Sequence, residues 1–315
     1  MARVFVTWRL PGSALDRLAA THETAVWAEE APPSAGELRE RAAPAEGLLT
    51  MLMDRVDAEL IAACPRLRAI SNYAVGVDNV DLAAATARGI PVGNTPGVLT
   101  DSTADLAVAL MLSAARRIVE GDAVVRRGEW LRWEPDFLLG RDLHGATVGI
   151  VGYGRIGQAV ARRLGGFGCE LLHSSRSGGT PLEELLDRSD FVTLHLPLGE
   201  DTRGLIGEEA LARMKPTAYL VNTARGPIVQ TAALGRALRG GEIAGAALDV
   251  TDPEPLPADH PLLEAPNLTV LPHLGSATRA TRAAMADVAV DNLVAALAGE
   301  RMPYCANPEV YERAS

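Results

Sequence analysis

The sequence contains almost no lysine. Lys215 is the only one among 30 basic residues, and all the others are arginine. Covalent catalysis through a Schiff base requires a desolvated lysine amine. The segment Arg-Met-Lys-Pro around Lys215 instead predicts a turn at the surface, because proline does not continue a helix. Lysine-based covalent chemistry is therefore not expected.

Cysteine and long apolar runs are also scarce. Cys64, Cys169 and Cys305 are the only cysteines, and their spacing matches neither a disulfide framework nor a metal site. We expect buried thiols and no bound metal. No apolar run approaches the roughly 20 residues that a membrane-spanning helix needs, and the first residues predict a short strand rather than a secretory signal. The expected location is the cytoplasm.

An excess of positive charge is absent as well. The formal net charge is -10 at pH 7. A protein that binds nucleic acid or an anionic membrane needs a basic face. Neither is expected as a partner.

Strand-like and helix-like segments alternate along the 315 residues. This alternation predicts parallel sheets with helices on both faces. The helix expected at 101–115 has Asp101 or Ser102 as a candidate cap, and a long helix is expected at 278–297. Strands are expected at 4–7, 47–52, 69–71, 148–151, 170–173, 191–194, 218–221, 245–248 and 268–271.

A glycine turn near mid-chain is the first sign of function. The apolar run 148–151 is followed by Gly152, Gly154 and Gly157 in the pattern G-x-G-x-x-G, and helical spacing continues after it. Such glycines permit a tight turn, close backbone approach to a pyrophosphate and close packing of helix on strand. Free amides at the helix N-terminus bind the phosphate charge. This segment predicts a dinucleotide site.

Because the turn lies near mid-chain, another domain must precede it. The sequence predicts an α/β protein with two Rossmann-like domains. A doubly wound, parallel-sheet dinucleotide-binding domain at 99–284 is expected to be inserted in a smaller, flavodoxin-like substrate domain. That substrate domain is formed by residues 1–98 and 285–315.

The end of the second strand of the dinucleotide domain indicates which cofactor binds. NAD enzymes usually have an acidic residue there that holds the ribose hydroxyls. Here the strand ends in Ser175, Arg176 and Ser177, and Glu170 lies at its start. An arginine at this place accommodates the 2′-phosphate of NADP. NADP(H) is therefore favoured over NAD(H).

Charged side chains follow the last three predicted strands. Arg225 follows the strand at 218–221, Asp249 and Glu254 follow the strand at 245–248, and His273 follows the strand at 268–271. Parallel strands bind ligands at their carboxyl ends. We expect these groups to meet at one edge of the sheet, beside the nucleotide.

These motifs together resemble the D-isomer-specific 2-hydroxyacid dehydrogenase family, in particular its glyoxylate/hydroxypyruvate reductase branch. They occur in the family's order and cover nearly the whole chain. The matching segments are 72–81 (NYAVGVDNVD), 94–105 (NTPGVLTDSTAD), 151–157 (VGYGRIG), 191–198 (FVTLHLPL), 221–226 (VNTARG), 252–255 (DPEP) and 271–276 (LPHLGS).

The resemblance implies a role for each catalytic candidate. His273 would give a proton to the substrate's carbonyl oxygen, since imidazole changes its protonation state near neutral pH. Glu254 would orient the His273 ring. Arg225 would bind the carboxylate of a 2-oxo acid through its planar guanidinium, and the backbone amides of Val75 and Gly76 would complete that carboxylate site.

The resemblance also implies contacts with substrate, cofactor and a second subunit. Leu52 would line the substrate pocket. Trp133, in a segment that reaches across the dimer in this family, would contact the partner's pocket. The stretch after Ser177 is shorter than is usual in the family, so a strand is expected to be missing there. The cofactor-binding candidates are Thr103, Gly152, Tyr153, Gly154, Arg155, Ile156, Gly157, Ser175, Arg176, Ser177, His195, Pro197, Thr202, Thr223, Ala224, Asp249 and Gly275.

The implied protein is a homodimeric NAD(P)H-dependent reductase of small 2-oxo acids, glyoxylate and hydroxypyruvate first, yielding D-2-hydroxy acids. Two alternatives remain open. One is another branch of the superfamily, similar to phosphoglycerate or phosphite dehydrogenases; formate dehydrogenases lack the acid that matches Glu254. The other is a nucleotide-sensing binding protein, similar to the co-repressors built on this fold.

Overall fold

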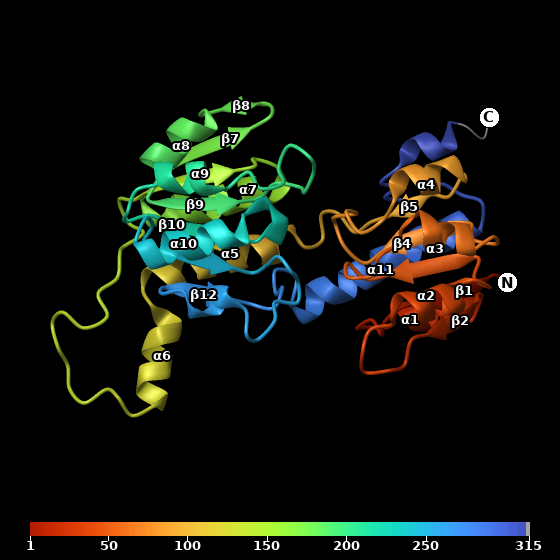
Figure 1. Cartoon of the computed structure of the whole chain (residues 1–315). Helices are drawn as coiled ribbons and strands as arrows, with labels where there is room; N and C mark the ends of the chain where they lie inside the picture. Colours follow the sequence, from red (N-terminus) through yellow and green to blue (C-terminus); the bar gives the residue numbers. More distant parts are fainter. Residues whose placement is uncertain (313–315) are drawn as a thin grey trace. The chain divides into compact units, whose positions relative to one another are not determined.

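The computed structural model describes residues 1–312, which form two compact units (Figure 1). Unit 1 comprises Met1–Leu99 and Ala277–Ser315, and unit 2 comprises Thr100–Ser276. The first crossing lies one residue from the expected position. The second lies eight residues before the expected 284/285 boundary, because helix α11 (Arg279–Leu297) is continuous and packs against the sheet of unit 1. The last three residues of the expected segment 285–315 lie outside the described residues.

Unit 1 is built around a five-stranded parallel sheet with the order β2-β1-β3-β4-β5. This is the flavodoxin-like order. Its strands are β1 (Arg3–Val6), β2 (Glu23–Val26), β3 (Gly47–Thr50), β4 (Ala69–Asn72) and β5 (Val92–Gly93). Its helices, besides α11, are α1 (Ala14–Thr21), α2 (Ala35–Ala42), α3 (Ala58–Ala63), α4 (Leu82–Ala87) and the 3-10 helix η4 (Pro308–Tyr311).

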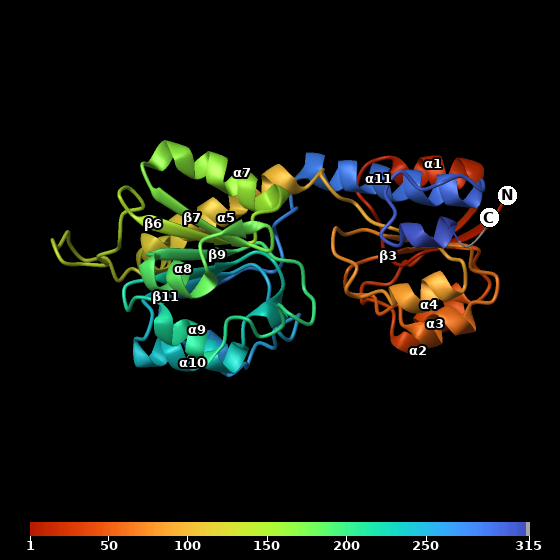
Figure 2. The same ribbon diagram turned by 90° about the horizontal axis from the view of Figure 1, so that it is seen from above.

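Helices cover both faces of this sheet (Figure 2). Val4 and Leu49 pack under α1 and α11 on one face. Phe5 and Leu48 pack under α2, α3 and α4 on the other. Neighbouring strand residues thus serve opposite cores, which explains why these strands appear as continuous apolar runs.

Unit 2 contains a seven-stranded sheet with the order β12-β11-β10-β9-β6-β7-β8. Strands on both sides of the first strand, β6, give the doubly wound arrangement expected from the sequence. The strands are β6 (Thr147–Val151), β7 (Glu170–Ser175), β8 (Gly178–Gly179), β9 (Phe191–Leu194), β10 (Tyr219–Asn222), β11 (Gly245–Leu248) and β12 (Leu268–Val270). The helices are α5 (Thr100–Ala115), α6 (Ile118–Arg126), α7 (Arg155–Leu164), α8 (Leu182–Arg188), α9 (Glu208–Arg213) and α10 (Thr231–Gly240), with 3-10 helices η1 (Gly165–Phe167), η2 (Gly226–Ile228) and η3 (Pro261–Glu264).

Two layers of helices cover this second sheet, and Figure 2 shows α5 and α7 on one side with α9 and α10 on the other. Ile150 and Phe191 belong to the core under α5 and α7. Val192 and Leu220 belong to the core on the opposite face. The sheet is therefore buried on both sides, as the alternating pattern predicted.

The stretch after Ser177, where a strand was expected to be missing, contains one very short strand. β8 has only two residues, Gly178 and Gly179, and pairs antiparallel with the end of β7. The sequence did not indicate this strand. It also missed β2, which is half-exposed at the edge of its sheet, and the two-residue β5.

The candidate caps of α5 are wrong. The helix begins at Thr100, so Asp101 and Ser102 lie within its first turn. The Asp101 carboxylate instead accepts a hydrogen bond from Arg163 of α7 at 3.0 Å. This interaction joins two helices on the same face of the sheet. Acidic side chains are also favourable within the first turn of a helix, so Asp101 does not mark the residue before the helix.

Lys215 lies in the predicted turn between α9 and β10. Its ammonium is 2.8 Å from the carboxylate of Asp190, and Arg141 reaches the same carboxylate at 2.9 Å. Asp190 precedes β9, so this cluster lies at the amino-terminal edge of the sheet. Burial raises the pKa of Asp190, but the bond from Lys215, the Thr147 amide and Arg141 together hold it below its ordinary value. Lysine here has a structural role.

One segment of unit 2 stands away from its sheet. Helix α6 and the irregular chain after it project outward, drawn in yellow in Figure 1. Eight apolar side chains along this projecting segment, residues 118–140, are exposed, namely Ile118, Val119, Val125, Trp130, Leu131, Trp133, Phe137 and Leu139, whereas Val124 is buried. Among the described residues, no helix is long and apolar enough to cross a membrane.

Candidate active site

The catalytic candidates lie on loops at one edge of the unit 2 sheet. β10, β11 and β12 are parallel neighbours, so the loops at their carboxyl ends lie side by side. Arg225 belongs to the first loop, Asp249 and Glu254 to the second, and His273 to the third. The sheet thus brings together the charged groups that the sequence predicted at this edge.

The first loop is shaped by an asparagine. Asn222 ends β10, accepts a hydrogen bond from the Ala224 amide at 3.0 Å and donates one to the Arg225 carbonyl at 2.9 Å. Gly226 then passes against the second loop, since a Cβ on it would lie 1.8 Å from the carbonyl oxygen of Thr251. Only glycine permits this approach, which fixes the Arg225 backbone beside the loop that carries Glu254.

His273 and Glu254 form the central pair of the site. The Nδ1 of His273 is 2.6 Å from Glu254 Oε1, a short, charge-assisted distance. The two side chains are 24% and 25% exposed, so the pair is shielded but reachable. The other carboxylate oxygen of Glu254 accepts a hydrogen bond from the Thr251 amide at 3.3 Å. Because Nδ1 faces the carboxylate, Nε2 is the nitrogen left for a substrate.

Asp249 holds the histidine loop in place. Its carboxylate accepts hydrogen bonds from the Leu274 amide at 2.6 Å and the Gly275 amide at 2.8 Å. The His273 amide donates to the Asp249 carbonyl at 2.9 Å. His273 has φ 54, a left-handed conformation that non-glycine residues seldom adopt and that concentrates at functional sites. Burial raises the pKa of Asp249.

The glycine turn has the geometry of a dinucleotide site. Gly152 has φ 95, and a Cβ on it would lie 2.6 Å from the His195 carbonyl oxygen. A Cβ on Gly157 would lie 2.2 Å from the Gly152 carbonyl oxygen, whereas one on Gly154 would meet nothing within 4 Å. Two glycines therefore allow the turn, and the third leaves an open approach to the start of α7 at Arg155. These residues fit a bound pyrophosphate.

The end of β7 carries no acid. Ser175 Oγ lies 3.0 Å from Ser177 Oγ, and Arg176 is 81% exposed with Asp201 at 3.5 Å. Glu170 pairs across to Thr147 at the opposite end of the strand, as the sequence predicted.

His195 lies at the end of β9, beside the glycine turn. Its Nε2 is 2.9 Å from the hydroxyl of Thr193, and its Nδ1 is 3.4 Å from that of Thr223. Burial lowers the pKa of His195 to about 3. The ring is therefore neutral at physiological pH, which suits contact with a cofactor better than proton transfer.

The remaining cofactor candidates occupy the same edge. The Thr103 hydroxyl donates to the Gly275 carbonyl at 3.3 Å, which connects α5 with the histidine loop. Tyr153 stacks on His173 with 4.1 Å between ring centroids. The Thr202 hydroxyl donates to the Pro197 carbonyl at 2.8 Å. Ala224 is buried in the Arg225 turn, and Ile156 lies in the first turn of α7.

The other substrate candidates lie elsewhere in the chain. Leu52, Val75 and Gly76 belong to loops at the carboxyl ends of β3 and β4 in unit 1. Trp133 lies in the projecting segment and is 78% exposed. Their roles stay predictions.

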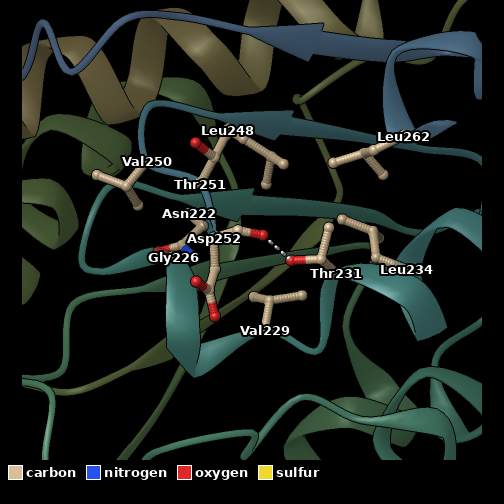
Figure 3. A pocket seen from close by; sticks show the side chains of 10 residues that line it. All are labelled: Asn222, Gly226, Val229, Thr231, Leu234, Leu248, Val250, Thr251, Asp252 and Leu262. Carbon is tan, nitrogen blue, oxygen red and sulfur yellow. Dashed lines mark hydrogen bonds between the residues drawn. The ribbon is translucent and has the colours of Figure 1, made fainter. Parts of the chain in front are cut away.

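A small cavity lies beneath the catalytic loops (Figure 3). Across it, the Thr231 hydroxyl donates to the Asp252 carbonyl at 2.8 Å. It is lined by Asn222, Gly226, Val229, Thr231, Leu234, Leu248, Val250, Thr251, Asp252 and Leu262. Arg225, Glu254 and His273 do not line this cavity, so it lies among the residues that pack behind the catalytic loops and is not the substrate pocket.

Sequence reasoning missed two groups that shape this site. Asn222 lies within the motif 221–226, and asparagine before a tight turn signals side-chain to backbone bonding, but the motif predicted no separate role for it. The bonds from Asp249 to the histidine loop had no local signal, since they join residues 25 and 26 positions apart.

Fold and site together define a dinucleotide-dependent dehydrogenase. The family described as "D-isomer specific 2-hydroxyacid dehydrogenase, NAD binding domain" matches residues 108–275. The chain is 49% identical to a glyoxylate reductase of Korarchaeum cryptofilum, over 98% of this chain and 96% of the relative. It is 47% identical to a glyoxylate reductase of Pyrococcus furiosus, with the same coverage.

Comparison with solved structures finds similar folds. The TT0316 protein of Thermus thermophilus superposes with a TM-score of 0.90 at 50% identity, covering 96% of this chain and 99% of the other. An NADPH-dependent glyoxylate/hydroxypyruvate reductase of Sinorhizobium meliloti, in complex with NADP and malonate, gives 0.84 at 35% identity, covering 96% of both chains.

The chain belongs to the D-isomer-specific 2-hydroxyacid dehydrogenase family, in its glyoxylate reductase branch. The family resemblance and fold class expected from the sequence are confirmed. The match to the family's NAD-binding domain and to glyoxylate reductases shows that the protein is an enzyme that uses NAD(P). These findings favour the enzyme over the alternative of a nucleotide sensor.

Proposed function

We propose that this enzyme reduces glyoxylate and hydroxypyruvate with NADPH, yielding the D-2-hydroxy acid where the product is chiral. The observation that carries the proposal is the 2.6 Å His273–Glu254 pair on the sheet edge that also carries the Arg225 turn and the glycine turn. Glyoxylate reductases at 45–49% identity support the substrate class.

Each residue of the site has a separate role in the proposed reaction. Arg225 binds the substrate's carboxylate, as do the amides of Val75 and Gly76. The glycine turn and the start of α7 would hold the nicotinamide cofactor, which would supply the hydride for the carbonyl carbon. Protonated His273 gives the Nε2 proton to the carbonyl oxygen and becomes neutral, keeping its Nδ1–H on Glu254. The Glu254 carboxylate fixes the orientation of the ring during the transfer.

Replacing His273 tests this proposal. His273→Ala should lower kcat for glyoxylate by about 10²- to 10⁴-fold, the usual contribution of a general acid. Binding of NADPH, followed by fluorescence, should persist because the glycine turn is unchanged. Turnover is measured at the nicotinamide absorbance band with a panel of 2-oxo acids.

The matched control is His144→Ala. His144 is exposed, and its Nδ1 lies 3.2 Å from the Phe167 carbonyl oxygen, away from the catalytic loops. That variant should keep full activity. Retention of full activity by His273→Ala, or no turnover of any 2-oxo acid by the unaltered enzyme, would sink the assignment.

We also propose a preference for NADP(H). Arg176 is exposed at the end of β7, flanked by the hydroxyls of Ser175 and Ser177, and the end of the strand itself carries no acid; Asp201, from another loop, contacts the guanidinium at 3.5 Å. A guanidinium between two hydroxyls matches a 2′-phosphate.

The protein is further proposed to act as a homodimer. The projecting segment 118–140 exposes two tryptophans and several aliphatic side chains, and exposed apolar side chains that gather on one segment mark an interaction surface. We propose that a second copy of this chain packs against these exposed side chains, and that Trp133 reaches the partner's substrate pocket.

A further inference from the structure

The loop at the end of β4 carries the two backbone amides proposed to bind the substrate's carboxylate. Within residues 1–312, the N–H groups of Val75 and Gly76 have no hydrogen-bond acceptor. Val75 is 36% exposed and Gly76 is half-buried, so this part of the loop lies at the protein surface. Successive N–H groups of this kind form a site for an anion.

Each carbonyl of this loop has its own donor. The Thr95 amide donates to the Ala74 carbonyl at 2.8 Å. The side-chain amide of Asn94 donates to the Val75 carbonyl at 2.8 Å, and that of Asn72 donates to the Gly76 carbonyl at 2.9 Å. Three consecutive peptide groups are therefore fixed by groups outside the loop.

The carbonyl bonds determine where the N–H groups point. Both peptide bonds around Val75 are trans. In a planar trans peptide, the carbonyl of one residue and the N–H of the next point in opposite directions. The bond to the Val75 carbonyl therefore turns the Gly76 N–H away from Asn94, and the bond to the Ala74 carbonyl turns the Val75 N–H away from Thr95.

Asn94 is itself held by the long helix α11. Its carbonyl accepts a hydrogen bond from the side chain of Asn292 at 2.9 Å. Asn292 is fully buried, and its carbonyl oxygen accepts the Tyr304 amide at 2.9 Å. A Cβ on Gly93 would lie 2.8 Å from the Asn292 side chain, so the backbone before Asn94 lies tightly against it.

We propose that Asn94 is a positioning residue for substrate binding, because it orients the peptide whose N–H, that of Gly76, receives the substrate's carboxylate. The inference rests on the proposed function only for the identity of the anion. Asn94 acts through the backbone and has no part in proton or hydride transfer. Its loss should therefore weaken the binding of the acid and leave the chemistry and the cofactor site intact.

The decisive variant is Asn94→Leu, which keeps the branched shape and removes the donor. A hydrogen bond to a charged group is worth roughly 1.5–3 kcal/mol. KM for glyoxylate, and Kd for oxalate on the enzyme–NADPH complex, should rise about tenfold or more. Both kcat and the Kd of NADPH should change less than about threefold. Asn94→His offers Nδ1–H at the same number of bonds from the backbone and should restore much of the binding.

The matched control is Thr21→Ala, which removes the bonds of one exposed hydroxyl-bearing residue to the Arg17 and Leu18 carbonyls in the same unit and should change no kinetic constant. The inference is overturned if Asn94→Leu lowers kcat with KM unchanged, or if it weakens NADPH binding as much as glyoxylate binding. It is also overturned if Thr21→Ala raises KM for glyoxylate as much as Asn94→Leu does. Glyoxylate turnover by the unaltered enzyme tests the proposed function separately, so the two failures are distinguishable.

Discussion

At the scale of single residues, the proposed preference for NADP(H) depends on Arg176, an arginine with only a weak ion pair in the protein. Arg176 and its partner Asp201 are 81% and 84% exposed, and their 3.5 Å contact is long for an ion pair. Exposed pairs of this kind contribute roughly 0–1 kcal/mol. The guanidinium can therefore exchange Asp201 for a phosphate at little cost.

Arg176→Ala is expected to remove the preference for NADPH. The kcat/KM with NADPH should fall about tenfold, since one charge-assisted bond is lost, while kcat/KM with NADH should stay unchanged. Both values are measured with glyoxylate at saturation. The control is Arg213→Ala, which breaks an exposed pair with Asp187 in the same unit. An unaltered enzyme that already prefers NADH would contradict the idea.

The residues of this site were predictable where a local pattern carries them. The glycine turn is contiguous, so its spacing alone predicted the turn that Gly152 and Gly157 make. Arg225, Glu254 and His273 could be placed on one edge because each follows a parallel strand. Asn94 could not be singled out, because its function depends on a carbonyl 19 positions away and on Asn292 of α11.

At the scale of elements, the active site depends on contact between two loops. Gly226 in the first turn of η2 lies directly against the Thr251 carbonyl, and Thr251 in turn donates its amide to Glu254. A displacement of the Arg225 turn would therefore be passed to the loop that carries Glu254. Close packing of this kind does not absorb an added methyl group without movement.

Gly226→Ala should destabilise the protein by about 2 kcal/mol or more, because overpacking against backbone forces a shift. It should also lower kcat, since Arg225 and Glu254 both move. Gly165→Ala is the matched control: its Cβ would meet nothing within 4 Å, and its backbone is right-handed helical. That variant should be neutral or slightly stabilising. Thermal unfolding and glyoxylate kinetics measure both, and equal melting temperatures would refute the overpacking argument.

Elements were predictable in proportion to their burial. The inner strands β3, β6, β9, β10 and β11 are buried on both faces, and their apolar runs predicted them within about two residues at each end. The edge strand β2 alternates exposed and half-buried residues over four positions, too short a pattern to recognise. β8 consists of two glycines paired with β7, and nothing in its composition favours a strand.

At the scale of the whole molecule, the projecting segment 118–140 is the feature that a monomer does not explain. Leu131 is 89% exposed and Leu139 is 66% exposed. Leu131→Glu/Leu139→Glu should place two charges in the proposed dimer interface and shift the protein toward monomer, as measured by sedimentation. Leu263→Glu, at an apolar position of η3 that is also exposed, is the control and should sediment as the unaltered protein does. A double variant that sediments unchanged would refute this interface.

The division into two units was also foreseeable from the position of the glycine turn. What the sequence did not show is that the second crossing falls at Ser276–Ala277. The reason is a long helix: α11 runs for 19 residues without interruption, and its buried face packs on β3 and β4 from its first half onward. Composition is uniform along that helix, so no change of pattern marks the boundary.

The scarcity of lysine has a practical consequence. The single side-chain amine lies at the amino-terminal edge of the unit 2 sheet, and the loops of Arg225, Glu254 and His273 lie at the carboxyl-terminal edge. Strands of four residues separate these edges by roughly 13 Å. An amine-reactive dye or support coupled at Lys215 would therefore attach on the side away from the catalytic loops, and it would have to displace the Asp190 carboxylate first.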